Sequence, residues 1–139
     1  MADNGRAEVL RRALEACVRG EAGALPELFT ADVSGWGPHM LVGSLAQLQE
    51  TVGAREEALS QVGIEIGSLD VFGNKGFVEY RLEAVFSGPF VLDEETVIEP
   101  TGDRIELGAA LVAEFEGDKI SAFRNYFDDA ALLEQLVPA

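Results

Sequence analysis

The chain has 139 residues, 47% of them hydrophobic and 25% charged, which is typical of a folded globular protein and not of a disordered one. Its net charge of −15 would repel phosphate groups, which argues against nucleic acid and anionic membranes as partners. No apolar run reaches the roughly 18 residues of a membrane span, and the start Met1-Ala-Asp-Asn-Gly5 has no features of a secretory signal. We therefore expect one domain over residues 1–139, located in the cytoplasm.

The cysteine and histidine counts limit metal and redox chemistry. Cys17 is the only cysteine and His39 the only histidine, so the sequence supports neither an intrachain disulfide nor a structural zinc site. Leu10, Leu14 and Cys17 share one helical face, which favours a buried thiol over a reactive one. We expect no metal site and no cofactor.

The first third of the chain has helical periodicity followed by an extended segment. Apolar residues recur at helical spacing over Ala7–Arg19, and Gly20 ends that helix. A short helix is predicted over Leu25–Phe29, where Pro26 is tolerated in the first turn. Ala31–Pro38 is predicted to be a short extended segment and loop.

A third helix is predicted to begin after Ser44. Gln47, three residues later, completes a capping-box pattern. An apolar stripe follows and Gly63 ends it. The stripe consists of Leu45, Leu48, Val52 and Leu59.

From Ile64 onward the hydrophobic period changes to two, which predicts strands. Hairpin turns are predicted at Gly73–Gly76 and Glu116–Asp118, and a long, partly extended loop at Ser87–Asp103. A closing helix over Ala130–Leu136 takes Asp128 or Asp129 as its N-cap. The four predicted strands are Ile64–Phe72, Phe77–Phe86, Arg104–Phe115 and Lys119–Phe127.

This order of elements predicts an α+β fold. Helices come first and a meander of strands follows, so we expect three N-terminal helices packed on a strongly bent antiparallel sheet, with a short C-terminal helix. Helices laid across the concave side of such a sheet would leave a conical cavity.

The last predicted strand indicates a binding pocket. Phe123, Asn125 and Phe127 lie on one face of it and place a single amide between two aromatic walls. Small-molecule pockets are built in this way, from apolar walls with a few fixed polar groups. We expect the pocket to bind an apolar small molecule.

The chain also resembles a known group of proteins. Its element order is similar to that of the nuclear transport factor 2-like superfamily. Gly117-Asp-Lys-Ile-Ser-Ala-Phe-Arg-Asn-Tyr-Phe-Asp128 resembles the Gly-Lys-Ile…Trp-Arg-Asp-Tyr-Phe-Asp ending of limonene epoxide hydrolases. Pro100-Thr-Gly102, Gly117-Asp-Lys-Ile120 and Leu132-Leu-Glu-Gln-Leu136 are similar to segments of SnoaL-like polyketide cyclases. The resemblance implies a cone-shaped fold that acts on an apolar oxygenated metabolite and pairs as a homodimer through its sheet.

The resemblance also implies catalytic residues. Limonene epoxide hydrolases use one Asp as general base, a second Asp as acid and an Arg between them. On this chain the Arg and the acid fall on Arg81 and Glu83, and the general base falls on Asn125. An amide cannot take a proton from water near neutral pH, so the chain departs from the family at this residue.

Two interpretations of Arg81 and Glu83 stay open. Both share a strand face with Glu79, while the alternate face is apolar from Val78 to Phe86, so the pattern alone favours a solvated charged face. The resemblance implies instead that Arg81 and Glu83 point into the cavity.

The remaining candidates also have a structural and a functional interpretation. Trp36, like the two phenylalanines, is either a core residue or a wall that stacks on the substrate. His39 is expected in a loop at the rim of the cone. If its ring folds inward, His39 could act as the missing base. Tyr80 and Tyr126 are expected to pack against the helices or another subunit.

Three hypotheses about function follow. The first is an enzyme of the epoxide hydrolase or polyketide cyclase type, in which Arg81, Glu83 and Asn125 act on a substrate held by Trp36, His39, Phe123 and Phe127. The second is a cone that binds an apolar ligand without turnover. The third is a dimerising interaction module with a filled core. We favour the enzyme, because the Arg-x-Glu spacing is retained.

Overall fold

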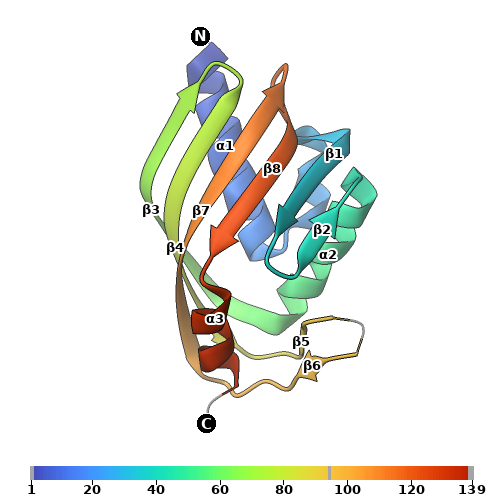
Figure 1. Ribbon diagram of the computed structural model, residues 1–139, viewed down its shortest axis with the longest axis vertical. Coiled ribbons are helices and arrows are strands. Elements are labelled where there is room, and N and C mark those ends of the chain that lie inside the picture. The colour runs from blue at the N-terminus through green and yellow to red at the C-terminus, as the bar shows by residue number, and fades with distance from the viewer. Residues whose placement is uncertain (1, 94, 138–139) are drawn as a thin grey trace.

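The predicted α+β class is confirmed. The computed structural model describes residues 2–93 and 95–137 and contains α1 (Ala2–Arg19), the 3-10 helix η1 (Ala22–Glu27), α2 (Leu45–Ala58) and α3 (Asp129–Leu136) (Figure 1). The strands are β1 (Phe29–Gly37), β2 (Met40–Val42), β3 (Leu59–Phe72), β4 (Lys75–Phe86), β5 (Phe90–Val91), β6 (Val97–Ile98), β7 (Arg104–Glu116) and β8 (Lys119–Phe127).

Six strands form one mixed, strongly bent sheet in the order β2-β1-β8-β7-β4-β3. Its neighbours are antiparallel except for β1 and β8, which run parallel with Gly35 opposite Phe123. The expectation of a wholly antiparallel sheet is therefore wrong at this one pair. The reason is that the segment after η1, which the sequence marks only as extended, pairs with the last strand on one side and with β2 on the other.

The helices cover one face of this sheet. In Figure 1, α1 crosses behind the long strands, and α2 lies beside it at the β2 end. We call the covered side the inner face and the opposite side the outer face. Along β4 the inner face carries Val78, Tyr80, Leu82, Ala84 and Phe86, which alternate with more exposed residues as the period of two predicts.

The bend depends on irregular pairing in β3. The ladder with β4 shifts register between Ser60 and Gly63, and Gln61 adopts a positive φ of 50° there. Bulges of this kind bend a strand and increase its twist. The prediction that the preceding helix continues to Gly63 is wrong, because Leu59 already pairs with Phe86 and the β-ladder takes over the backbone groups.

Capping residues identified in the sequence act as expected. The Ser44 hydroxyl accepts a hydrogen bond from the Gln47 backbone at 3.2 Å, and the Gln47 amide accepts one from the Gly43 backbone at 2.7 Å. At the start of α3, the Asp128 carboxylate accepts from the Ala131 backbone at 3.1 Å. These bonds satisfy backbone donors that the first helical turn leaves without partners.

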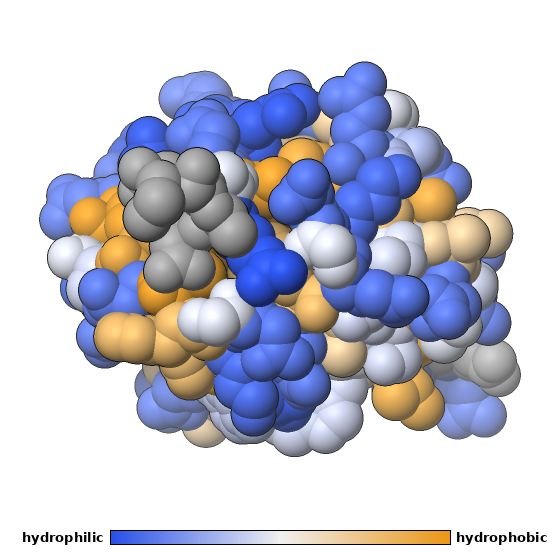
Figure 2. Space-filling view, turned by 90° about the horizontal axis from the view of Figure 1, so that it is seen from above, coloured by the Kyte–Doolittle hydropathy of each residue, from blue (hydrophilic) through white to orange (hydrophobic). Residues whose placement is uncertain are grey.

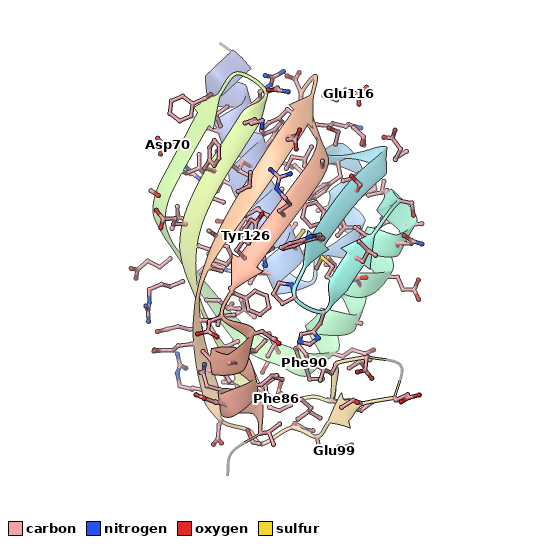
Figure 3. The ribbon with its side chains drawn as sticks, in the orientation of Figure 1. Asp70, Phe86, Phe90, Glu99, Glu116 and Tyr126 are labelled. Atoms are coloured by element: carbon pink, nitrogen blue, oxygen red, sulfur yellow. The ribbon has the colours of Figure 1, made fainter. Side chains whose placement is uncertain are left out.

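A second hydrophobic cluster lies at the end of the sheet near α3 and the small β5–β6 hairpin. Phe86 and Phe90 meet there edge to face, with ring centroids 6.5 Å apart (Figure 3). Ile105, Leu132 and Leu136 complete the buried part of the cluster with Ala58, Ala84 and Leu107. The segment Ser87–Asp103, predicted as a loop, thus contains a hairpin anchored by Phe90.

The surface is consistent with the high net charge. On the face seen from above, hydrophilic residues predominate and hydrophobic residues lie in small patches between them (Figure 2). In the described part of the chain, no helix has both the length and the apolar character that crossing a membrane requires.

Candidate functional site

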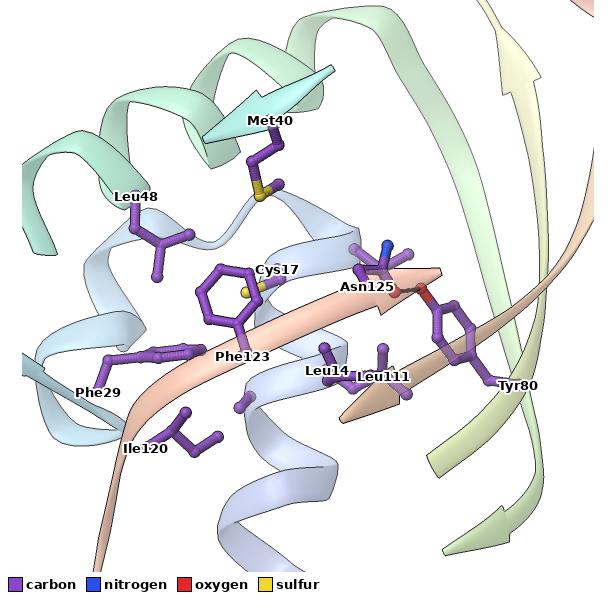
Figure 4. Close-up of a pocket in the computed structure, with 12 residues that line it drawn as sticks. Leu14, Cys17, Phe29, Met40, Leu48, Tyr80, Leu111, Ile120, Phe123 and Asn125 are labelled. Atoms are coloured by element: carbon purple, nitrogen blue, oxygen red, sulfur yellow. Dashed lines mark hydrogen bonds between the residues drawn. The ribbon is translucent and has the colours of Figure 1, made fainter. Parts of the chain in front are cut away.

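Two small cavities, which we call the helix lobe and the mouth lobe, lie between the inner face of the sheet and the helices. The helix lobe, about 50 Å³ in volume, has mostly apolar walls that include Leu14, Met40, Leu48 and Phe123 (Figure 4). The mouth lobe, about 60 Å³, lies beside α3 and β5, and its walls include Pro38, His39, Phe90, Phe127 and Leu132. The lobes adjoin at three shared residues, which are Val18, Tyr80 and Asn125.

A hydrogen bond marks the junction of the two lobes. The Tyr80 hydroxyl donates to Asn125 Oδ1 at 2.9 Å, and Figure 4 shows the two side chains meeting, Tyr80 from β4 and Asn125 from β8. Tyr80 is buried on β4, and Asn125 is half-buried on β8. Among the described residues the Asn125 Nδ2 group has no hydrogen-bond partner, so it remains a donor directed at the cavity.

The three β8 residues lie on the inner face, as the alternation predicts. Phe123 lines the helix lobe, where its ring packs edge to face on Phe29 at 5.9 Å between centroids, and Phe127 lines the mouth lobe. Asn125 lies between them and contacts both lobes. Their roles toward a ligand stay predictions.

Two glycines of β1 make room for these side chains. A Cβ at Gly35 would overlap the Phe123 ring, so the ring occupies the space that a side chain on β1 would fill. A Cβ at Gly37 would lie 3.1 Å from the Asn125 carbonyl oxygen and 3.3 Å from its Cβ. Glycine at both positions lets β8 bring the aromatic ring and the amide close to β1.

Arg81 and Glu83 lie on the outer face, so the expectation that they meet Asn125 in the cavity is wrong. Arg81 Nη2 lies 3.6 Å from Glu106 Oε2, and Glu83 Oε2 lies 3.2 Å from Arg104 Nη2. Neither residue lines either lobe. The physical reason is strand parity: with Tyr80 and Ala84 buried, the alternate residues must face solvent, where a charge needs no desolvation.

The aromatic candidates are also divided between the two faces. Trp36 is 44% exposed on the outer face and packs edge to face on Tyr126, with centroids 5.0 Å apart, so its expected place in the pocket is wrong. Tyr126 lies exposed on the outer face, away from the helices, so its expected packing against another subunit stays a prediction. Tyr80 packs in the core that includes residues of α1, as expected, and it also lines the cavity. Its place in the apolar alternation of β4 was the available signal.

His39 lies at the rim, as expected. It follows Pro38 in the two-residue connection between β1 and β2 and has a φ of 60°. Its Nε2 lies 2.8 Å from Asp129 Oδ1, and their side chains are 27% and 34% exposed. The imidazole therefore lines the mouth lobe while it remains accessible to water.

Carboxylates are absent from both lobes within the described residues. The two carboxyl groups with lowered pKa values lie elsewhere. The pKa of Asp93 is lowered mainly by the hydrogen bond from the Glu95 backbone N–H. Hydrogen bonds from Thr96 and the electrostatic interaction with His39 lower it further. The hydrogen bond from Arg124 lowers the pKa of Glu114 on the outer face. The described residues also contain no group of three or more His, Cys, Asp or Glu side chains placed to hold a metal ion.

Comparison with known proteins supports this architecture. A protein of Jannaschia sp. CCS1 described as a SnoaL-like polyketide cyclase has a TM-score of 0.86 at 14% identity, over 99% of this chain and 94% of its own. A protein of Acidithiobacillus ferrooxidans described as a polyketide cyclase has a TM-score of 0.78 at 20% identity, over 94% of each chain. An LEH-like epoxide hydrolase of M. tuberculosis has a TM-score of 0.72 at 11% identity, over 96% of this chain and 86% of its own.

At these identities the structural likeness shows the fold alone. No curated protein is significantly similar in sequence to the chain. The family model of the SnoaL-like domain, however, matches residues 10–123, which is most of the chain. The protein therefore belongs to the SnoaL-like domain family, within the nuclear transport factor 2-like superfamily.

Proposed function

We propose that the cavity binds a compact, largely apolar molecule that carries one oxygen acceptor, such as a ketone, alcohol or epoxide. The observation that carries this proposal is the Asn125 amide. Its Oδ1 is fixed by Tyr80, its Nδ2 has no partner among the described residues, and apolar walls surround it.

The energetics of the amide favour such a ligand. A polar group next to an apolar cavity loses roughly 1–3 kcal/mol when it has no hydrogen bond. An oxygen acceptor on the ligand satisfies Nδ2, while the apolar remainder is removed from water at about 25 cal/mol per Å². The Tyr80 bond holds the amide in one orientation, so little entropy is lost when the ligand binds.

The volume of the lobes limits the size of the ligand. Each lobe exceeds the roughly 10–15 Å³ that a single water molecule needs, but neither is large. A small ring fits the available space best. A ligand that reaches both lobes would contact Tyr80 and Asn125, which line both of them.

A second candidate function is the enzyme of the epoxide hydrolase or polyketide cyclase type. Membership of the SnoaL-like family and the fold shared with an epoxide hydrolase support it. The outward position of Arg81 and Glu83 removes the Asp-Arg-Asp arrangement as its mechanism. Asn125→Asp places a carboxylate at the junction, and if that residue holds the position of the lost base, the variant hydrolyses cyclohexene oxide faster than the parent.

The outer face supports the further proposal of a homodimer. Four aromatic residues lie exposed there, on β1, β3, β4 and β8, in two contacting pairs. They are Trp36, Phe72, Phe77 and Tyr126. Light scattering of the parent and of a Phe72→Glu/Phe77→Glu variant tests this proposal, since the charged variant should be monomeric.

Ligand-observed NMR tests the binding proposal. The probes are cyclopentanone and methylenecyclopentane, which match in size but differ in the oxygen acceptor. Asn125→Leu should weaken cyclopentanone binding about tenfold, the equivalent of one hydrogen bond of about 1.4 kcal/mol, and leave the hydrocarbon unaffected.

Arg81→Gln on the outer face is the matched control and should change neither affinity. Equal affinities of the parent and Asn125→Leu for cyclopentanone would contradict the role of Asn125. Failure of both probes to bind would contradict the proposed ligand class.

A further inference from the structure

We propose that His39, oriented by Asp129, is the proton-transfer residue of the mouth lobe, and that it removes a proton from the carbon next to a ketone whose oxygen is bound by Asn125. The proposal rests on the proposed function for the position of that oxygen. It adds a reaction class and two residues that a binding role does not require.

Three elements of the fold converge on the mouth lobe. His39 comes from the β1–β2 turn, Asn125 from β8 and Tyr80 from β4, and all three line the mouth lobe. Of the described residues that line this lobe, His39 is the one whose side chain ordinarily titrates near neutral pH. A base and a donor for the ligand oxygen therefore border the same small volume.

A hydrogen bond to Asp129 orients the His39 ring. The carboxylate accepts a hydrogen from Nε2 at 2.8 Å, which leaves Nδ1 as the nitrogen that carries the lone pair. No described residue donates to or accepts from Nδ1. When Nδ1 takes a proton, the adjacent carboxylate stabilises the positive charge, as orienting acids do in other His–Asp pairs.

The charges that face His39 from its other sides are also negative. Asp93, on the β5–β6 hairpin, interacts electrostatically with the imidazole. Glu50, on α2, lines a surface groove that His39 also lines. No Lys or Arg side chain of the described residues lines that groove or the mouth lobe. Among the described residues that line the groove or the mouth lobe, or that bond His39, the charged side chains are therefore all acidic.

The turn backbone also places the imidazole at the rim. The φ of 60° at His39 lies in the left-handed region, which Asn, Asp and His adopt more often than other non-glycine residues, so the turn accommodates histidine there.

The proposed step is balanced without a co-reactant. His39 Nδ1 takes the proton from the α-carbon, the C–H electron pair becomes the C=C bond of an enolate, and the carbonyl π pair moves to the oxygen. Asn125 Nδ2 donates a hydrogen bond to that oxygen as its negative charge grows. The imidazolium exchanges its proton with solvent and returns one to the α-carbon.

Deuterium exchange into cyclopentanone tests the proposal with a defined probe. In D2O, loss of the α-proton signal in ¹H NMR should be faster with protein than in buffer. His39→Asn keeps a residue that tolerates the turn but has no base, so the protein-dependent rate should fall about 100-fold.

Asp129→Asn should lower the rate about tenfold and leave cyclopentanone binding unchanged, because the imidazolium loses its partner. Asp70→Asn is the control with the same change of charge, since Asp70 is exposed on β3, and it should leave both quantities unchanged. His39→Gly, which also fits the turn, confirms that the loss does not depend on the asparagine amide.

Binding is measured on the same samples by saturation-transfer NMR, which separates the two proposals. Cyclopentanone that binds without accelerated exchange would overturn the role of His39 and leave the proposed function intact. Exchange that persists in His39→Asn and His39→Gly would overturn it as well. Absence of both binding and exchange would overturn this inference together with the proposed ligand class.

Discussion

The two faces of the sheet place the same residue types in opposite environments. On β4, Phe86 is completely buried on the inner face, whereas Phe77 is 41% exposed on the outer face. Tyr80 donates a hydrogen bond inside the cavity, while Tyr126 lies exposed against Trp36. In this fold the side of the sheet, and not the residue type, decides whether a side chain contacts the cavity or solvent.

The largest expected effect is a matched pair of substitutions on β4. Phe86→Ala removes a fully buried ring from the cluster near α3 and should lower the free energy of unfolding by about 3–5 kcal/mol. Phe77→Ala removes a ring that water already reaches, so the loss should stay below about 1 kcal/mol. Urea denaturation measures both. Similar losses in the two variants would mean that another subunit covers Phe77 in solution.

A second pair of substitutions compares the two faces through glycine. Gly35→Ala puts a methyl group into the Phe123 ring and should destabilise the fold by about 1–3 kcal/mol, the usual cost of overpacking. Gly108→Ala on β7 meets nothing within 4 Å and should be neutral or slightly stabilising. Thermal denaturation distinguishes them. The smaller ring-free side chain of Phe123→Leu should recover part of the loss caused by Gly35→Ala.

Removing one hydroxyl tests the junction of the lobes. Tyr80→Phe deletes the hydrogen bond to Asn125 and should lower the free energy of unfolding by about 1 kcal/mol. Cyclopentanone should also bind more weakly, because the amide is then free to rotate. Tyr126→Phe on the outer face should leave cyclopentanone binding unchanged. Equal cyclopentanone affinities for the parent and Tyr80→Phe would show that the hydrogen bond does not hold the amide in place.

The smallest expected effect concerns an ion pair of the outer face. Arg124 bonds Glu114 at 2.9 Å and holds the pKa of that carboxyl below its ordinary 4.5. A lowered pKa in the folded state adds stability above the unfolded value, and this stability is lost as the pH falls through the folded value. Glu114→Gln should therefore be slightly less stable than the parent at pH 7 and equal to it in strong acid. A difference that persists in acid would assign the effect to packing.

Much of the fold could be predicted from periodicity and caps. The alternation in Lys119–Phe127 gave the same bounds as β8, and the Ser44 and Asp128 caps lie where the sequence pattern indicates. These features are local, since strand alternation and capping depend on residues a few positions apart. The β2 strand and the β5–β6 hairpin were missed, because each is only two or three residues long.

The candidate site was predictable only in part. The apolar alternation correctly turns Phe123 and Asn125 inward, and the same rule applied to β4 turns Tyr80 inward and Arg81 outward. Resemblance to a family pointed Arg81 and Glu83 the other way, since a one-residue difference in register moves every side chain to the opposite face. The pairing of His39 with Asp129 had no local signal, because it joins a turn early in the chain to the last helix.

The parallel pairing of β1 with β8 has a consequence for the order of folding. Strands β3, β4, β7 and β8 are each antiparallel to a neighbour, and the β3–β4 and β7–β8 pairs are joined by short turns, so these contacts need little loop closure. Gly35 and Phe123, by contrast, come together only after most of the chain between them has been closed into a loop, and such contacts form slowly. We expect the β1 wall of the cavity to assemble last, so that a ligand meets a complete site only in the fully folded protein.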